Sequence, residues 1–467
     1  MRKLIVYLSF VLAAVNSWSQ NKQILYNFTA VSQSMMTNPG ADYEYKFYFG
    51  IPLLSNFSTH IGSSGFSAYD LFADNGVDFS TKLTNVIHST NRNDKLIFNE
   101  QLEIFNGGFR VGDWDNRGYV SFGMYQEVDM FVYVPKDPLV LLLEGNQNHI
   151  GRSFNLGDIA AKAEAVSVLH LGFHKKVKEN LIIGGRGKIY TSGFNATTTN
   201  NSGYIYTIPS NGNNLYDQVI YSDLQLQTSG VSDYIEGNET NQGGREILKK
   251  TLLGSNLGIG FDAGVTYYPK KNIQLTASIL DVGFINHSKD VKSYAYKGIY
   301  NYQGINPDFV DPSASGSSFE NFEDAIPLDT TFAKYTTWRP IKINASYQYS
   351  FDDGRGNADC NCAGDSNQEY QNAVGAQLFV MTTPRIPMTA LTAYYRRSML
   401  QNHLNLKATY TVDSFSYTNL GIGLAGTIGA VNVYLMADNL LEYRDLSKAN
   451  SLSLQLGLNF VFKDKDE

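Results

Sequence analysis

Long apolar runs are missing from this sequence. No segment reaches the roughly eighteen consecutive apolar residues that a helix needs to cross a bilayer. The longest apolar run near the start, residues 4–15, is too short for that role. It follows Arg2 and Lys3 and precedes the small residues Ser17 and Ser19. This order predicts a cleaved signal peptide over residues 1–19 and a protein exported to the cell envelope.

Basic residues are outnumbered, and they form no stripe along the chain. The 37 Lys and Arg residues face 44 Asp and Glu residues, which gives a formal net charge of −7. Nucleic-acid binding depends on clustered Lys and Arg side chains that neutralise phosphates. We therefore exclude nucleic acid as a partner.

Cysteine is nearly absent, with only Cys360 and Cys362 in the chain. Both lie in a hydrophilic loop rich in Asp and Gly. In an oxidising envelope they can form a strained, small-ring disulfide. Half of a soft-metal site is a second interpretation, but no His lies nearby to complete it. A structural periplasmic loop is the third, and we expect no metal and no cofactor.

The motifs of common enzymes are also missing. The sequence contains no HExxH, no GxSxG and no P-loop. Residues 421–426 match GxGxxG, but they lie in a run of period two without a following helix, so we interpret the match as accidental. His170 and His174 would lie about 13 Å apart on a strand, too far to share a metal. We expect a protein that is not an enzyme.

What the sequence does contain is alternation. In Ser451–Phe462, SLSLQLGLNFVF, every second residue is apolar, and the run ends on Phe460 and Phe462. Such a strand has one apolar and one polar face, as a barrel with lipid outside and a polar lumen requires. The 31 Tyr, 27 Phe and 41 Gly suit aromatic girdles and tight turns. We interpret this run as the closing strand, with Phe460 and Phe462 as the signal for barrel insertion.

Similar runs recur along the chain and predict an all-β fold, a transmembrane antiparallel β-barrel of about 14 strands, within a range of about 12–16. Connections near residues 115, 176, 270, 398 and 429 are short, whereas 350–371 is a longer exception on the same side. The longest insertions, 53–94, 195–255 and 286–339, alternate with them and should be extracellular. Both termini should be periplasmic. The expected divisions are 20–42, an N-terminal segment or hatch, 43–462, the barrel, and 463–467, a charged tail.

Charged residues recur on the faces expected to point inward, where they avoid the cost of contact with lipid. Their functional interpretation is a selectivity lining or a ligand site. The other interpretation is a set of ion pairs that fills a narrow lumen, and the mixed signs do not describe an ion-selective pore. These residues are Glu127, Asp129, Lys162, Glu164, Arg186 and Lys188, with Lys342 and Lys407 further along the chain.

Several stretches resemble the DUF5723 family of outer-membrane β-barrel proteins from Bacteroidota, whose function is unknown. They are residues 32–34 with 38–39, residues 47–54, residues 360–362, residues 374–379 and residues 436–441. The resemblance covers essentially the whole mature chain and brings no catalytic residues with it. More distantly, the chain is similar to the PorP/SprF proteins of type IX secretion and gliding and to fatty-acid-transporter barrels.

Our leading hypothesis is a non-enzymatic component or scaffold of an outer-membrane protein assembly that docks through its long loops. The alternative is a channel or transporter for small or hydrophobic solutes, with residues 24–38 as a hatch. A barrel-embedded hydrolase is a third and weaker option. The expected partners are outer-membrane lipids, the barrel-insertion machinery and other envelope proteins. The expected location is the outer membrane of a Gram-negative bacterium.

Overall fold

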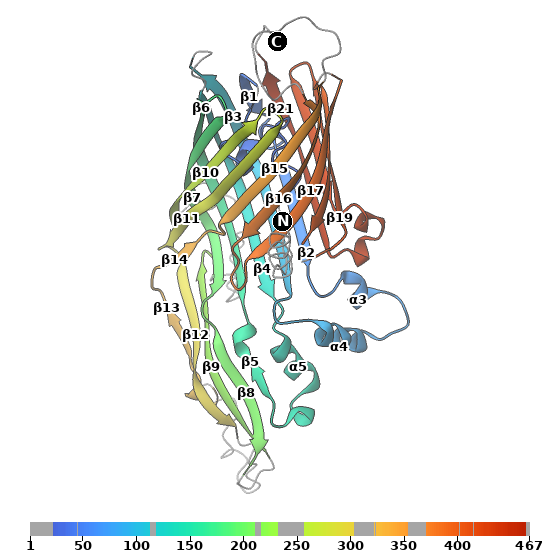
Figure 1. Ribbon diagram of the computed structural model, residues 1–467. Helices are drawn as coiled ribbons and strands as arrows, with labels where there is room; N and C mark the ends of the chain where they lie inside the picture. Colours follow the sequence, from blue (N-terminus) through green and yellow to red (C-terminus); the bar gives the residue numbers. More distant parts are fainter. Residues whose placement is uncertain are drawn as a thin grey trace, which may run out of the picture.

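The computed structural model describes residues 22–43, 45–112, 118–210, 216–231, 256–302, 322, 324–353, 370–400, 402–413 and 415–463. Fourteen antiparallel strands pair in sequence order and close into a barrel, so the predicted fold class is confirmed (Figure 1). Two short strands, β1 and β2, share one place in the ring, and both pair with β3 and β21. The barrel strands are β1 (Phe47–Gly50), β2 (Phe57–Ser63), β3 (Lys95–Val111), β4 (Gly118–Tyr133), β6 (Ala161–Lys178), β7 (Leu181–Thr198), β10 (Asn256–Lys270), β11 (Ile273–His287), β15 (Lys342–Asp353), β16 (Tyr370–Met381), β17 (Met388–Met399), β18 (Leu404–Val412), β19 (Asn419–Ile428), β20 (Val431–Asp438) and β21 (Ser451–Phe462).

The outer surface of the barrel is apolar because alternate side chains of each strand point away from the lumen. On β21, Phe460 and Phe462 are exposed on this surface, and they pair with Phe49 and Phe47 across the seam. Large apolar side chains are exposed in the same way around the ring, as a barrel surrounded by lipid requires. Examples are Leu169, Leu171, Phe173, Ile183, Ile189, Leu257, Ile259, Phe261, Ile343, Leu378, Leu391, Ile422, Leu424, Val433 and Leu435. No helix in the described part of the chain is long and apolar enough to cross a membrane.

The two ends of the barrel differ in the way the sequence predicted. Connections such as those between β6 and β7, β10 and β11, and β19 and β20 are short and lie at the end where β21 finishes. The long connections lie at the other, extracellular end (Figure 1). They carry α3 (Ala68–Phe72), α4 (Phe79–Ser89), α5 (Lys136–Glu144), β5 (Ser153–Asn155) and the short 3-10 turns Gln147–His149, Leu156–Asp158, Glu442–Arg444 and Leu446–Lys448.

The long connections contain more regular structure than the insertions expected from the sequence. Residues 53–94 are not extracellular throughout, because β2 continues the ladder of β1 after a break and belongs to the barrel. Residues 139–143 lie in α5, which packs against α4 through Val140 and Ile87. The two insertions expected to be surface loops form a sheet that extends the barrel wall outward (Figure 1). Its strands are β8 (Ser202–Pro209), β9 (Tyr216–Ser229), β12 (Val291–Tyr302), β13 (Leu328–Thr331) and β14 (Tyr335–Trp338).

The barrel begins at Phe47 rather than at residue 43. Tyr43 and Tyr45 are buried in an aromatic cluster with Tyr48 and Tyr119, at the end of the lumen where β1 starts and β21 finishes. The chain up to and including Tyr43, residues 22–43 with the short helix α2 (Ser34–Thr37), lies inside the barrel and is called the plug below. The proposed signal peptide, Cys360, Cys362 and residues 464–467 of the tail lie outside the described residues.

Candidate functional site

The plug is held in the lumen by polar contacts and by an apolar cluster, in which Ile24, Leu25, Phe28 and Val31 pack with Ala425, Tyr434 and Met436. The Gln33 amide donates to Glu103 Oε2 on β3 at 2.9 Å and to Asn459 Oδ1 on β21 at 2.9 Å. Asn27 Nδ2 donates to Thr276 Oγ1 on β11 at 3.1 Å and to Ser346 Oγ on β15 at 2.5 Å. The plug therefore bonds to strands all around the ring.

Several wall side chains donate to main-chain oxygens of the plug. Arg186 binds the oxygens of Met35 and Met36, the latter at 3.4 Å, and Lys407 Nζ binds the oxygen of Tyr26 at 2.5 Å. Ser278 Oγ donates to Thr37 O at 2.7 Å, and Asn432 Nδ2 donates to Ala30 O at 3.2 Å. Such bonds recognise the path of the plug backbone more than its side chains.

Glycines on the wall make room for the plug at two places. A Cβ on Gly264 would clash with Asn38, and one on Gly184 would clash with Pro39. On β19, a Cβ on Gly421 would lie 3.0 Å from Ile24 Cδ1, and one on Gly423 would lie 2.5 Å from Ile24 Cγ2. We call these places the glycine sockets. They explain Gly421 and Gly423 of the 421–426 motif, whose resemblance to a dinucleotide-binding loop is accidental.

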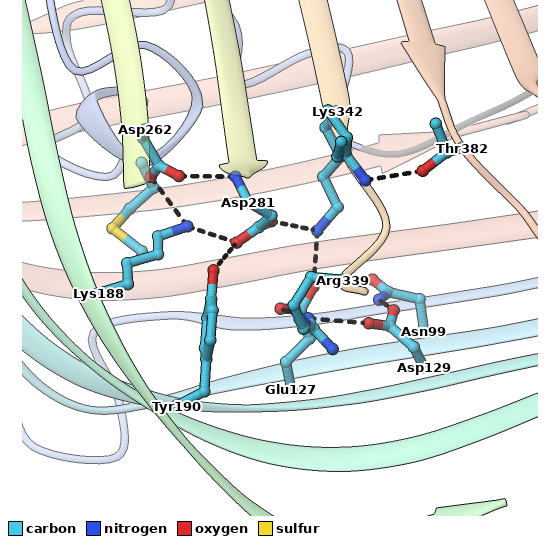
Figure 2. A network of polar contacts seen from close by, with 12 residues as sticks. Asn99, Glu127, Asp129, Lys188, Tyr190, Asp262, Asp281, Arg339, Lys342 and Thr382 are labelled. Atoms are coloured by element: carbon cyan, nitrogen blue, oxygen red, sulfur yellow. Dashed lines mark hydrogen bonds and ion pairs between the residues drawn. The ribbon is translucent and has the colours of Figure 1, made fainter. Parts of the chain in front are cut away.

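Beyond the plug, a chain of ion pairs crosses the lumen (Figure 2). Lys188 Nζ lies 2.9 Å from Asp262 Oδ2 and 2.6 Å from Asp281 Oδ1. Lys342 Nζ lies 3.1 Å from Asp281 Oδ2 and 2.8 Å from Glu127 Oε1, so it links the two halves of the network. Arg186 joins it through Asp262 at 3.2 Å.

Arg339 forms the other end of this network. Its guanidinium donates to Glu127 Oε2 at 2.8 Å, to Asp129 Oδ2 at 3.2 Å and to Glu164 Oε1. Lys162 Nζ lies 3.4 Å from Glu164 and donates to the main-chain oxygen of Trp338. We call these groups the charge belt: Glu127, Asp129, Lys162, Glu164, Arg186, Lys188, Asp262, Asp281, Arg339 and Lys342. Acidic and basic members are equal in number, so the belt is close to neutral.

The structure brings all six lumen charges predicted from the sequence into this belt, together with Lys342. Lys407 lies apart and contacts the plug. Sequence reasoning missed Asp262, Asp281 and Arg339. Asp262 lies between Phe261 and Ala263 in an alternating run, so a period of two could have placed it on the inner face. Asp281 adopts a φ of 60°, where the ladder between β10 and β11 shifts register, so alternation could not place it. Arg339 lies before Pro340 in what looked like a loop.

Opposite walls also touch at the extracellular mouth. Ile97 on β3 and Phe131 on β4 share one buried cluster with Phe379 on β16 and Met388 on β17. Above it, Arg385 in the turn between β16 and β17 donates to Asp158 Oδ1 at 2.8 Å. The lumen is therefore closed by an apolar layer, by the charge belt and by the plug, one after another.

Among the described residues, two cavities lie beside the plug, and Lys22 lines both of them. The larger is bordered by Glu127, Lys188, Asp281 and Lys342 of the charge belt. The smaller is lined by the plug residues Lys22 and Ile24 on one side and by β2, β3, β20 and β21 on the other. The plug thus forms part of the wall of both cavities. Among the described residues, no group of three or more His, Cys, Asp and Glu is arranged to hold a metal ion.

Comparison with known proteins identifies a family and several barrels. The family described as "Family of unknown function (DUF5723)" matches residues 39–438. No curated protein matches the chain. The Ralstonia pickettii toluene transporter TbuX is 11% identical over 92% of this chain and 93% of its own, with a TM-score of 0.39. A Pseudomonas aeruginosa FadL homologue is 10% identical over 96% and 99%, with a TM-score of 0.44. At these values neither structure indicates what this chain transports or binds.

Proposed function

This chain belongs to the DUF5723 family, whose function is unknown, and we propose that it is a gated outer-membrane channel or transporter for small solutes with the plug as its gate. This is the channel or transporter that the sequence analysis gave as the alternative, and it is better supported than a scaffold of a protein assembly. The observation that carries the proposal is the polar seat of the plug, which lies between two cavities.

The chemistry of the seat suits a segment that moves. Each neutral hydrogen bond in it contributes only about 0.5–1.5 kcal/mol, because water can replace either partner. The wall groups in these bonds are hydrophilic and tolerate a wet lumen. The apolar side chains of the plug, such as Phe28, pack against Tyr434 and Met436 and would have to leave that contact. Withdrawal of the plug would also join the two cavities that share Lys22.

A second candidate is the assembly component. It is favoured by the extracellular sheet, which exposes Tyr204, Tyr216, Tyr296, Ile299 and Phe332. Exposed apolar groups that gather on one projecting element are typical of interaction sites. Purification from native membranes with mass spectrometry would test it, and recovery of the protein alone would count against this role. In either case we propose export by a signal peptide over residues 1–19 and a Bacteroidota-type outer membrane as the location.

The gate can be tested by a substitution that disturbs the plug but not the wall. Phe28 is fully buried, where it packs with Val31, Tyr434 and Met436. In Phe28→Asp a carboxylate would be buried in this cluster at a cost of several kcal/mol, so the plug should leave its seat. We expect liposomes that contain this variant to take up small polar solutes at least ten times faster than liposomes with the unaltered protein.

The matched control is Phe72→Asp, because Phe72 is 73% exposed on α3, outside the barrel. It should leave uptake unchanged. Heat-modifiable migration on gels would show that both barrels are folded. If folded Phe28→Asp protein were as impermeable as the unaltered protein, the proposed gate would be wrong.

A further inference from the structure

The smaller cavity lies against a regular array of side chains near the extracellular mouth. Asp438 on β20 is opposite Ser453 on β21, and Ser453 is opposite His60 on β2. One step along the strands, Met436, Gln455 and Ser58 form the next row. All six residues line the cavity. The two rows together therefore present polar groups from three adjacent strands to this cavity.

Three polar atoms of this array have no hydrogen-bond partner among the described residues. They are Ser58 Oγ, His60 Nε2 and Asp438 Oδ1. Their side chains are at least nine-tenths buried, with relative exposures of 5%, 4% and 3%. The second oxygen of Asp438 accepts from Ser453 Oγ at 3.1 Å. A buried carboxylate oxygen without a donor is costly unless a ligand or water completes it. The array is therefore incomplete as it stands.

A basic group lies across the glycine socket from Asp438. Lys407 and Thr409 on β18 are opposite Gly423 and Gly421, and a Cβ on Gly421 would clash with both Asp438 Oδ1 and Thr409 Oγ1. The two glycines thus leave a gap between the acidic and the basic side chain. Lys407 Nζ reaches over it to the Tyr26 oxygen of the plug and lies 4.3 Å from the ring centroid of Tyr394.

The plug itself fills this gap. Ile24 inserts its side chain over the two glycines, and the Tyr26 carbonyl oxygen occupies the acceptor position at Lys407. That oxygen stands where the carboxylate oxygen of a ligand would stand, and the Ile24 side chain stands where an aliphatic group would lie. Asp438 Oδ1 and Thr409 Oγ1 keep their acceptor positions unused.

We propose that this array is a binding site for a small zwitterion, an aliphatic α-amino acid, which the plug occupies by imitation in the closed state. The inference rests on the proposed function, since the site opens only when the plug withdraws. The ammonium group of the solute would donate to Asp438 and Thr409, and its carboxylate would accept from Lys407. Charge-assisted hydrogen bonds of this kind are about twice as strong as neutral ones. A solute without one of the two charges would leave Asp438 or Lys407 unpaired.

Three probes that share the isobutyl group of leucine separate these contributions: L-leucine, isopentylamine, which lacks the carboxylate, and 4-methylpentanoate, which lacks the ammonium group. Uptake of each is measured in liposomes with the full chain carrying Phe28→Asp, so that the plug is out of the way. We expect leucine to enter at least ten times faster than either single-charge probe, because each lost charge contact weakens binding by about that factor. Unlabelled leucine should compete with labelled leucine, and uptake should saturate as the leucine concentration rises.

Two further variants assign the roles. Asp438→Asn should remove the advantage of leucine over 4-methylpentanoate, and Lys407→Met should remove its advantage over isopentylamine. Asp445→Asn, a loss of an exposed acid between β20 and β21, is the matched control and should change nothing. If the plug-released protein passed all three probes equally, the zwitterion site would be wrong while the gate stood. If the plug-released protein passed neither these probes nor any other small solute, the proposed gate itself would be wrong.

Discussion

At the scale of single residues, Arg339 holds together one end of the charge belt. It is 2% exposed and contacts three carboxylates from the facing strands β4 and β6. Lys342 can balance Glu127 alone, and Lys162 lies 3.4 Å from Glu164. Without the guanidinium, the carboxylates of Asp129 and Glu164 would lie close together, and the remaining basic side chains would not neutralise both of them. The sequence around Arg339 gives no hint of this position.

Replacement of Arg339 should therefore destabilise the protein strongly. Arg339→Met should lower the free energy of unfolding by about 3–5 kcal/mol, because it leaves buried carboxylates unpaired. Urea unfolding in lipid vesicles measures the change. Lys297→Met breaks an exposed pair with Asp223 and should cost less than about 1 kcal/mol. Adding Glu164→Gln to Arg339→Met should restore part of the loss. An equal effect of Arg339→Met and Lys297→Met would contradict this account.

At the scale of elements, the extracellular helices α4 and α5 are joined by a polar bridge over an apolar contact. Glu144 at the end of α5 binds His149 Nε2 at 2.7 Å and His88 of α4. Ile87 and Val140 are buried between the two helices. The hydrogen bonds from His149 and His88 lower the pKa of the Glu144 carboxyl below its usual value of 4.5.

This shift sets a pH dependence for the helix pair. Because the pKa of Glu144 is lower in the folded state, its stabilising effect is complete above about pH 4.5. It is lost as the pH falls through the lowered value. We expect the distribution of distances between spin labels on α4 and α5 to broaden as the pH falls through the lowered pKa. In Glu144→Gln the distribution should not respond to pH there. An unaltered protein whose helices stay together at any acid pH would show that Glu144 is not the link.

At the scale of the whole molecule, the barrel closes where β21 meets β1 and β2. Phe460 and Phe462 lie on the lipid side of this seam, 36% and 45% exposed. Carboxylates at these positions would oppose both membrane insertion and closure. The double substitution Phe460→Asp with Phe462→Asp should abolish assembly, measured as the loss of the heat-modifiable band in outer-membrane fractions.

Phe72→Asp with Phe332→Asp provides the comparison, since both residues are more than 70% exposed on extracellular elements. That pair should assemble normally. Normal outer-membrane levels of the Phe460 and Phe462 variant would overturn the role of the closing strand.

The barrel was predictable from the sequence because alternation is a local property. Each strand of the wall shows its two faces within its own residues, and loop lengths then fix the two ends. The break between β1 and β2 was not predicted because residues 51–56 interrupt the alternation. The outer sheet was not predicted because its strands have water on both sides and carry no clear apolar face.

The site was predictable only in part, for a related reason. Charges such as Glu127 and Lys188 were found because they stand in alternating runs. Asp281 was lost at a shift in register, and Arg339 precedes a proline outside any run. The plug was expected as a hatch, but no pattern in residues 22–43 shows which wall groups receive it. Gly421 and Gly423 gain their meaning only when Ile24 is seen against them.

The position of the plug also has a consequence for the order of folding. Gln33 is bonded to Asn459, 426 residues later in the chain. The enclosed segment is exported first, yet its seat is finished only when the last strand arrives. Contacts this distant in sequence are slow to form. A finished cylinder would offer the segment little room to enter, so we expect the sheet to curl around it. Changes to residues 22–43 should then alter how fast the barrel matures as well as how well it closes.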